Sequence, residues 1–461
     1  MKVVLNKEKK FKGDCIIIFC SKKVLKTNLS NKEYKFSIKK LKNKSIVNLS
    51  DFNSRKYVVL LDSKNQELNR RVGAEIADKL SDKTYLRDFS SGSNSIFSFL
   101  EGIMLKSYDF CKYKSNNDFR LKFINIISSN LSKEIVFELN GLVGSVFKAR
   151  DWINEPVNKL TTNQFLNEIK SLENLGVVVE VLGKSKIKTL GMGGIMGVNQ
   201  GSHDEPAFVK SEWKPRNPKN RKPIVLIGKG ILFDTGGINI KTGDVMSNMK
   251  ADMGGSSMVL GALRAVAIND LPVHVIVLTP ITENRINGKE LVPGDIIKMY
   301  SGKTVEILNT DAEGRLILAD ALTFAKKLDP ILVIDSATLT GSAFKITGCH
   351  GAVVMGTDRK NMKSLKKAGE DVYERLLELP MWEEFNETLK SNVADTNNLG
   401  SVEGQAICAG FFLKSFTDYP WIHIDMAGPA FRNKGSYYLP EGGTGFGVRL
   451  LYQFFKNKFV N

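Results

Sequence analysis

The chain has 461 residues, more than one hydrophobic core usually supports, so we expect two domains. An apolar fraction of 42% and 39 glycines are typical of a folded α/β protein and exclude a disordered chain. No apolar run is long enough to cross a bilayer, and the basic N-terminus lacks the apolar stretch of a signal peptide. We therefore expect a cytoplasmic protein without membrane contact.

The net charge of +17 is concentrated in the first third of the chain. Residues 1–150 hold 30 Lys and Arg against 15 Asp and Glu, whereas the remaining residues hold 36 against 34. One interpretation is a surface for nucleic acid or another acidic partner. The other is a Lys- and Asn-rich surface that contacts only solvent. No motif that interleaves aromatic and basic residues favours the first interpretation.

In chain order, the predicted elements begin with a small α/β domain over residues 1–130. Its strands are expected at 15–19 and 57–61, and its helices at 68–79 and 95–106. A long amphipathic pattern over 133–150 predicts a helix that connects the domains, within a junction at 131–155.

Residues 156–461 alternate apolar strands with helices, which predicts a second, α/β domain with a largely parallel, twisted mixed sheet flanked by helices. The expected strands are 177–181, 224–227, 274–278, 305–308, 331–334, 353–355 and 421–424. The expected helices are 162–172, 254–268, 312–327, 360–377 and 445–455. A surface loop is expected at 212–221. In such a sheet, ligands bind beyond the carboxyl ends of the strands.

A first cluster of charged residues follows the expected strand at 224–227. Lys229 stands between two glycines, Asp234 precedes Thr-Gly-Gly, and Lys241 follows. Asp252 comes just before the helix expected at 254, whose N-terminus favours an anion. A phosphate-binding loop is the alternative, but Gly-Lys-Gly lacks the GxxxxGK[ST] spacing of that loop.

The second cluster is the segment Asn309–Leu318, with sequence NTDAEGRLIL. It places Asp311, Glu313 and Arg315 at alternate positions, so an extended backbone would point all three side chains the same way. Each charge alone could belong to a structural ion pair. Seven charged groups that converge on one edge of a sheet favour a metal centre instead.

The expected centre relies on oxygen ligands, because the five cysteines and four histidines are scattered. Oxygen-rich sites suit Mg²⁺, Mn²⁺ or Zn²⁺, and four carboxylates can hold two ions. Two such ions would polarise a carbonyl group and generate a bound hydroxide near neutral pH. A lysine is a metal ligand only as the neutral amine, and Lys229, at the end of a buried strand, is the better candidate. Lys241 could stay charged and donate to a developing oxyanion.

These motifs resemble the two-metal family of leucyl (cytosol) aminopeptidases over residues 150–461. The heptapeptide NTDAEGR is that family's signature. Gly-Lys-Gly, Phe-Asp-Thr-Gly-Gly, the lysine seven residues after the aspartate, and Ala-Asp-Met-Gly-Gly stand in the family's order. So do the segments 335–341 (DSATLTG) and 442–447 (GGTGFG).

The resemblance implies a role for each matching position. One ion would be held by Lys229, Asp234, Asp252 and Glu313, and the other by Asp234, Asp311 and Glu313. Lys241 and Arg315 would be the catalytic pair, with Arg315 holding a bicarbonate that acts as general base. The substrate's first residue would contact Met249, Thr338, Gly341 and Ala430 and the backbone carbonyl of Leu339.

The resemblance also implies a function: removal of the N-terminal residue, with a leucine-type preference, from peptides with a free N-terminus. The expected cofactors are two Mn²⁺ or Zn²⁺ ions per subunit, and the expected assembly is a homohexamer. Two alternatives stay open. One is a nucleic-acid-binding accessory role of the basic N-terminal third, and the other is a metal-dependent phosphohydrolase.

Overall fold

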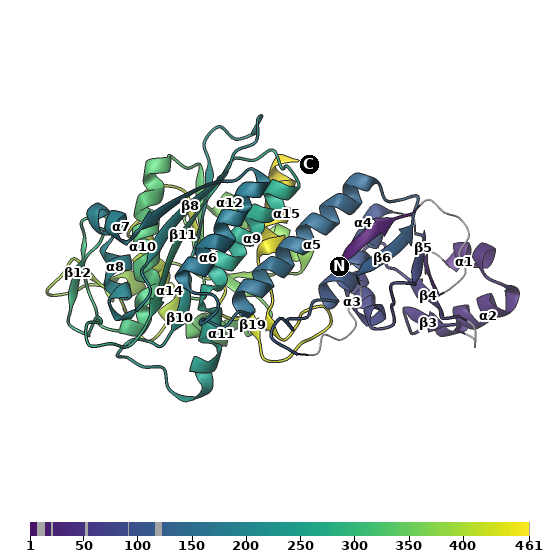
Figure 1. Ribbon diagram of the computed structural model, residues 1–461, viewed down its shortest axis with the longest axis horizontal. Helices are drawn as coiled ribbons and strands as arrows, with labels where there is room; N and C mark the ends of the chain where they lie inside the picture. Colours follow the sequence, from purple (N-terminus) through teal and green to yellow (C-terminus); the bar gives the residue numbers. More distant parts are fainter. Residues whose placement is uncertain (7–13, 20–21, 51–53, 91, 116–121, 461) are drawn as a thin grey trace. The chain divides into compact units, whose positions relative to one another are not determined.

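The computed structural model describes residues 1–461 except 7–13, 20–21, 51–53, 91, 116–121 and 461 (Figure 1). Contacts divide the chain into two compact units. The first unit comprises Met1–Phe147 and Lys434–Glu441, and the second comprises Lys148–Asn433 and Gly442–Asn461. None of the described helices is both long and apolar enough to span a membrane.

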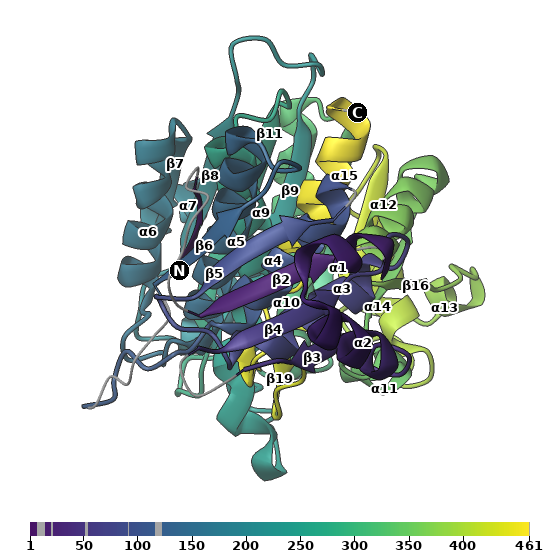
Figure 2. The same ribbon diagram turned by 90° about the vertical axis from the view of Figure 1, so that its right-hand side faces the viewer.

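The first unit contains a six-stranded sheet in the order β1-β6-β5-β2-β4-β3, and Figure 2 shows its strands side by side. All neighbours are parallel except β3 and β4. The strands are β1 (Lys2–Leu5), β2 (Cys15–Phe19), β3 (Ile46–Asn48), β4 (Lys56–Leu60), β5 (Tyr85–Phe89) and β6 (Phe123–Ile127). The helices are α1 (Lys22–Asn28), α2 (Asn31–Lys40), α3 (Gln66–Ala77) and α4 (Ser93–Lys106), and α5 (Lys133–Asn154) continues into the second unit.

The second unit is built on a nine-stranded mixed sheet in the order β16-β15-β18-β14-β9-β11-β8-β7, with β10 paired to β11. Its central strands β18, β14, β9 and β11 are parallel, so their carboxyl ends meet at one edge. These strands are β7 (Val178–Gly183), β8 (Ala207–Trp213), β9 (Ile224–Gly228), β10 (Gly230–Asp234), β11 (Val275–Asn284), β14 (Leu332–Ala337), β15 (Ala352–Gly356), β16 (Leu376–Glu378) and β18 (Trp421–Asp425).

Helices cover both faces of this sheet (Figure 1). One face carries α9 (Gly254–Ile268), α12 (Arg359–Val372) and α15 (Val448–Phe459). The other carries α8 (Gly193–Val198), α10 (Glu313–Ala325) and α14 (Gln405–Lys414). Both helix layers bury apolar side chains against the strands. Because the central strands are covered on both faces, their sequences are continuous apolar runs.

Shorter elements connect these layers. They are α6 (Thr162–Lys170), η1 (Ser171–Leu175), α7 (Lys184–Leu190), η2 (Asn199–Gly201), η3 (Gly243–Met253), η4 (Thr310–Ala312), η5 (Lys326–Leu328), α11 (Gly341–Thr347) and α13 (Glu384–Glu387). The short strands are β12 (Ile296–Lys298), β13 (Thr304–Glu306), β17 (Thr396–Asn397), β19 (Phe431–Arg432) and β20 (Gly442–Gly443).

The predicted α/β class with a mixed, centrally parallel sheet is confirmed, but several element boundaries are wrong. The helix expected over 360–377 ends at Val372, because Tyr373 adopts a left-handed conformation with φ of 59°. The chain then forms β16. The first residues of the loop expected at 212–221 belong to strand β8. Strand β8 was not predicted from the sequence, because Lys210 and Glu212 interrupt the apolar pattern of this strand. The side chains of these two residues form an ion pair at 3.1 Å.

Helix α10 is held in place by a buried carboxylate at its centre. Asp320 is fully buried and accepts hydrogen bonds from the backbone N–H groups of Ile195 (2.9 Å) and Tyr300 (2.9 Å). Burial raises the pKa of Asp320 to about 7, although these backbone donors oppose the rise. The first turn of α10 carries the signature residues, so Asp320 helps to fix the helix that presents them.

We predict that Asp320 gives folding stability a pH dependence that Asp320→Asn removes. The raised pKa means that the folded protein holds this proton more tightly than the unfolded chain does. The stabilisation is therefore complete below the unfolded pKa of ~3.9 and is lost as pH rises through about 7. Urea unfolding of both proteins in chelator should show the wild-type free energy of unfolding falling relative to that of the variant between about pH 4 and 7. A constant difference would contradict the assignment.

Candidate metal centre

The predicted charged residues meet at the carboxyl edge of the central parallel strands. Lys229 lies between β9 and β10, and Asp234 is the last residue of β10. Asp252 is the second-last residue of η3, which leads into α9, and Glu313 is the first residue of α10. Lys229, Asp234, Asp252 and Glu313 are each 7% exposed or less, so the protein buries a dense group of charges.

Lys229 is the centre of this group. Its Nζ lies 2.8 Å from Asp252 Oδ2 and 2.9 Å from Glu313 Oε1, and it donates to the carbonyl oxygen of Thr338 at 3.0 Å. Gly314 makes the approach to α10 possible, because a Cβ there would lie 2.7 Å from Lys229 Nζ. The glycine in the signature is therefore needed for close packing against the lysine.

Lys241 joins a second pair of carboxylates. Its Nζ lies 2.8 Å from Asp234 Oδ2 and also contacts Asp311 Oδ1. Lys241 and Asp311 are both partly exposed, unlike Lys229 and Glu313. The two lysines thus occupy different environments, as the sequence predicted, and Lys241 is the one nearer to solvent.

Three carboxylates come close enough to share an ion. One oxygen atom from each of Asp234, Asp252 and Glu313 lies within 4.8 Å of the others. Asp311 is outside this set and joins it through Lys241. Among the described residues, Glu313 Oε2 is buried without a hydrogen-bond partner. A buried carboxylate oxygen in that state is costly, so the donor set fits a divalent cation.

The signature segment is helical, which agrees with the helix expected over 312–327 for Glu313 and Arg315 but makes the expectation of an extended backbone wrong. Asp311 lies in the short 3₁₀ turn η4, and Glu313 and Arg315 lie in the first turn of α10. The expected strand at 305–308 is shorter than predicted, since β13 ends at Glu306. Alternation therefore does not aim the three side chains at one point. The turn from η4 into α10 directs Glu313 toward Lys229 and Asp311 toward Lys241.

Arg315 is 2% exposed and donates from Nη1 to the carbonyl oxygen of Leu399 at 3.1 Å. Its Nε is buried without a hydrogen-bond partner among the described residues. Burial lowers the pKa of Arg315 to about 10, although the Glu313 carboxylate opposes the shift. The guanidinium group thus retains a free donor next to the carboxylate cluster, which suits an anion.

The carboxylates and lysines shift one another's protonation. Burial lowers the pKa of Lys229, but Asp252, Glu313 and Asp234 raise it by more, so the pKa lies above its usual value. The same opposition raises the pKa of Lys241. Burial, with repulsion from Glu313 and Asp234, raises the pKa of Asp311 to about 7. Without an ion, Lys229 is therefore an ammonium group, and it must lose its proton before it can coordinate a metal.

Two buried asparagines that sequence reasoning missed support the cluster. Asn284, at the end of β11, donates to Asp234 Oδ1 at 2.8 Å. Asn398 accepts from the backbone N–H of Leu308 at 2.8 Å and donates to the carbonyl oxygen of Asn309 at 2.7 Å. Neither asparagine stands at a characteristic distance in sequence from the predicted metal ligands, so no motif identifies it. The strand-end position of Asn284 was the one available signal.

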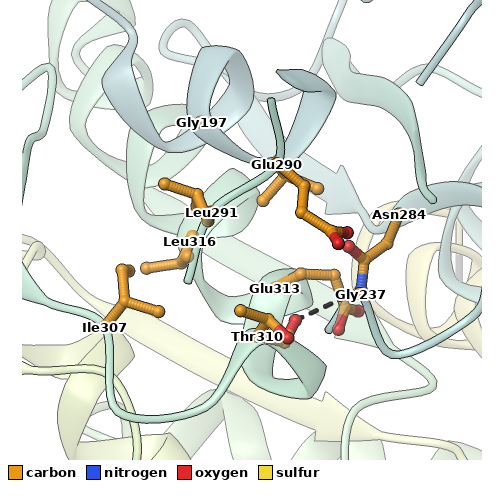
Figure 3. A pocket seen from close by; sticks show the side chains of 10 residues that line it. Gly197, Gly237, Asn284, Glu290, Leu291, Ile307, Thr310, Glu313 and Leu316 are labelled. Atoms are coloured by element: carbon orange, nitrogen blue, oxygen red, sulfur yellow. Dashed lines mark hydrogen bonds between the residues drawn. The ribbon is translucent and has the colours of Figure 1, made fainter. Parts of the chain in front are cut away.

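A small cavity lies behind Glu313, with a volume of about 10 Å³ (Figure 3). Asn284, Glu290 and Thr310 line one side of it together with Glu313, and apolar residues such as Leu291 line the other. This volume holds about one water molecule. The carboxylate cluster is thus closed off from larger molecules on this side.

Two of the five positions predicted to bind substrate lie beside the N-terminus of α9. Thr338 and Ala430 flank Gly254, where a Cβ would lie 3.0 Å from Thr338 Cγ2 and 3.2 Å from Ala430 Cβ. Met249 lies in η3, three residues before Asp252, and is partly exposed. Leu339 and Gly341 follow β14, and Gly341 begins α11. Thr338 and Ala430 therefore both lie next to Gly254. That Met249 and Gly341 line the same substrate pocket stays a prediction.

The mixed sheet with its parallel central strands, together with the buried cluster of carboxylates and lysines, fits a metal-dependent hydrolase. Comparison with protein families matches residues 147–452 to the cytosol aminopeptidase family, catalytic domain. The chain belongs to this family and is a metal-dependent aminopeptidase. This confirms the resemblance seen in the sequence.

Relatives and solved structures agree with this membership. A probable cytosol aminopeptidase of Chlorobium limicola is 40% identical over 80% of this chain and 77% of its own length. One from Geobacter sp. (strain M21) is 39% identical over 77% of this chain and 74% of its own. A mutant of tomato leucine aminopeptidase has a TM-score of 0.86 and 26% identity, covering 98% of this chain and 96% of that one. The bottromycin maturation enzyme in complex with Mn has a TM-score of 0.85 and 27% identity, covering 97% and 100%.

We predict that Glu313→Ala abolishes metal binding while Lys241→Ala retains it. Glu313 supplies the buried oxygen without a partner, whereas Lys241 supplies a positive charge to carboxylates that an ion would also neutralise. The metal content of both purified variants after equilibration with Mn²⁺ and gel filtration measures this directly. A full metal complement in Glu313→Ala, or equal loss in both variants, would contradict the assignment.

Proposed function

We propose that this aminopeptidase releases single N-terminal residues, with a leucine-type preference, by means of two divalent ions, Mn²⁺ or Zn²⁺. The buried Glu313 Oε2 beside Asp234 and Asp252 is the observation that carries the proposal. One ion would be held by Lys229, Asp234, Asp252 and Glu313, and the other by Asp234, Asp311 and Glu313. The ions would supply Lewis-acid activation of the scissile carbonyl and of a water molecule.

The chain's own residues would orient the substrate around these ions. The carboxylate of Asp252 would help to bind the free α-amine of the peptide, which limits the enzyme to N-terminal residues. Thr338 donates to Asp252 Oδ1 at 2.8 Å and so fixes the orientation of this carboxylate. Thr338, Ala430 and Met249 would contact the first side chain, with Gly341 and the carbonyl of Leu339 beside them.

The catalytic pair would be Lys241 and Arg315. Ions bound to Asp234 and Asp311 would free the ammonium group of Lys241 to donate to the oxyanion that develops on the scissile carbonyl. The unpartnered Nε of Arg315 supports an anion at that position, and a bicarbonate there would accept the proton of the attacking water.

The assembly and location also belong to this proposal. We propose a cytoplasmic homohexamer. The membership of the cytosol aminopeptidase family supports this assembly.

The proposal predicts that the Mn²⁺-loaded protein hydrolyses leucine p-nitroanilide and leaves p-nitrophenyl phosphate intact. Lys241→Ala should keep KM close to the wild-type value and lower kcat by ~10²–10³, the typical loss for one oxyanion donor. Steady-state kinetics on both substrates measures these effects, with N-acetyl-leucine p-nitroanilide as the control that lacks the free amine. Hydrolysis of the phosphate ester alone would favour the phosphohydrolase alternative.

A second candidate function is binding of nucleic acid by the first unit. Helix α2 exposes Lys32, Lys35 and Lys39 on the face opposite buried Ser37. A row of exposed lysines on one helix face attracts phosphate groups. The charge bias of residues 1–150 motivates the same candidate.

If this second candidate is right, the protein should retard DNA or RNA in a gel-shift assay, and the affinity should fall steeply with salt. Replacement of Lys32, Lys35 and Lys39 by alanine should weaken the binding and leave peptidase activity unchanged. Absence of binding at low salt would remove this candidate and leave the aminopeptidase proposal intact.

A further inference from the structure

Asn284 is a buried residue beside the carboxylate cluster that is not among the predicted ligands. It is the last residue of β11 and is 5% exposed. Its side-chain amide donates from Nδ2 to Asp234 Oδ1 at 2.8 Å. The same amide donates to the carbonyl oxygen of Thr310 at 3.2 Å (Figure 3). One amide group therefore connects a predicted ligand with the residue that precedes Asp311.

The backbone of Asn284 is fixed from the same side. Its carbonyl oxygen accepts hydrogen bonds from the backbone N–H of Thr235 at 2.9 Å and from Thr235 Oγ1 at 3.0 Å. The residue after Asp234 is thus bound to the residue that orients Asp234. Three segments meet at Asn284: the end of β10, the end of β11 and the turn η4.

Gly237 shows how closely these segments pack. Its φ is +63°, and a Cβ at this position would lie 2.8 Å from Thr310 Oγ1 and 3.2 Å from Asn284 Oδ1. A side chain there would push apart the loop after Asp234 and the turn before Asp311. The second glycine of the Thr-Gly-Gly motif therefore preserves the contact between Thr310 and Asn284.

The hydrogen bonds divide the two oxygens of Asp234 between different partners. Oδ1 accepts from Asn284 Nδ2 and from the backbone N–H of Gly236, both at 2.8 Å. Oδ2 faces the ammonium group of Lys241 at 2.8 Å. With Oδ1 satisfied by neutral donors, the orientation of the carboxylate is fixed and Oδ2 remains directed toward a cation.

We propose that Asn284 is a positioning residue for the metal centre: it orients Asp234 and sets the distance between Asp234 and the segment that carries Asp311 and Glu313. The inference rests on the proposed two-ion function. Groups that hydrogen-bond metal ligands are typically worth ~10–100-fold in metal affinity. Asn284 supplies both of its amide hydrogens to this task, which explains a buried amide at a strand end.

The experiment compares two Asn284 variants with a matched control. Asn284→Leu keeps the approximate shape and removes both donors, and Asn284→Ala removes the side chain with the least risk of overpacking. Thr282→Val is the control. Thr282 lies on the same strand and is 1% exposed. Its hydroxyl accepts from Asn199 Nδ2 at 3.0 Å and donates to the carbonyl oxygen of Glu283 at 3.1 Å, and neither residue is a predicted ligand.

Two readouts separate positioning from a general role in folding. Calorimetric titration of Mn²⁺ into chelator-treated, dialysed protein gives the metal affinity, and thermal unfolding with and without Mn²⁺ gives the metal-induced rise in Tm. Both Asn284 variants should bind Mn²⁺ ~10–100-fold more weakly than the wild type and show a smaller rise in Tm. Thr282→Val should lower the metal-free Tm by a similar amount and keep the wild-type Mn²⁺ affinity.

Wild-type Mn²⁺ affinity in the Asn284 variants, with a loss of Tm like that of the control, would overturn the inference and leave the proposed function intact. A wild-type protein that binds no Mn²⁺ and releases no leucine would instead overturn the proposed function. If Asn284→Leu fails to fold, the affinity of Asn284→Ala decides the matter alone.

Discussion

The burial of three carboxylates within 4.8 Å of one another is the constraint on which the rest of the second unit depends. Burying an ionised carboxylate is expensive unless a positive charge or several hydrogen bonds compensate it. Lys229 and Lys241 supply that charge in this structure, and each has a pKa raised by the carboxylates that it contacts. Because one oxygen of Glu313 is left without a partner, the two lysines compensate the cluster only in part.

The architecture brings these charges together and keeps them rigid. Parallel neighbours β9, β11 and β14 end at the same edge, so residues distant in sequence meet there. Glycines permit the approach, as at Gly314, and buried amides such as Asn284 and Asn398 connect the loops. The charged side chains are thus held in place by groups that carry no charge themselves.

Much of this could be predicted from the sequence, and the failures have physical causes. Apolar periodicity predicted the helix at 254–268 with the observed bounds, because the apolar pattern of the sequence changes at both ends of this helix. Spacing and family resemblance singled out Lys229, Asp234, Asp252 and Glu313, which the structure brings together. Periodicity predicted a helix over 312–327 that contains Arg315, but it could not show that Asp311 lies in a helical turn, because η4 is only three residues long. The role of Asn284 depends on a contact 50 residues away in sequence, which no local pattern records.

The central claim is that two bound divalent ions balance the negative charge of the buried carboxylates, which Lys229 and Lys241 balance in this structure. A crystal structure of the Mn²⁺-loaded protein, with anomalous scattering measured at the manganese edge, tests it most directly. We expect two peaks, one next to Lys229 and Asp252 and one next to Asp311, with Asp234 and Glu313 contacting both. A loaded crystal with no peak, or with Lys229 still in hydrogen-bond contact with Asp252 and Glu313, would contradict it.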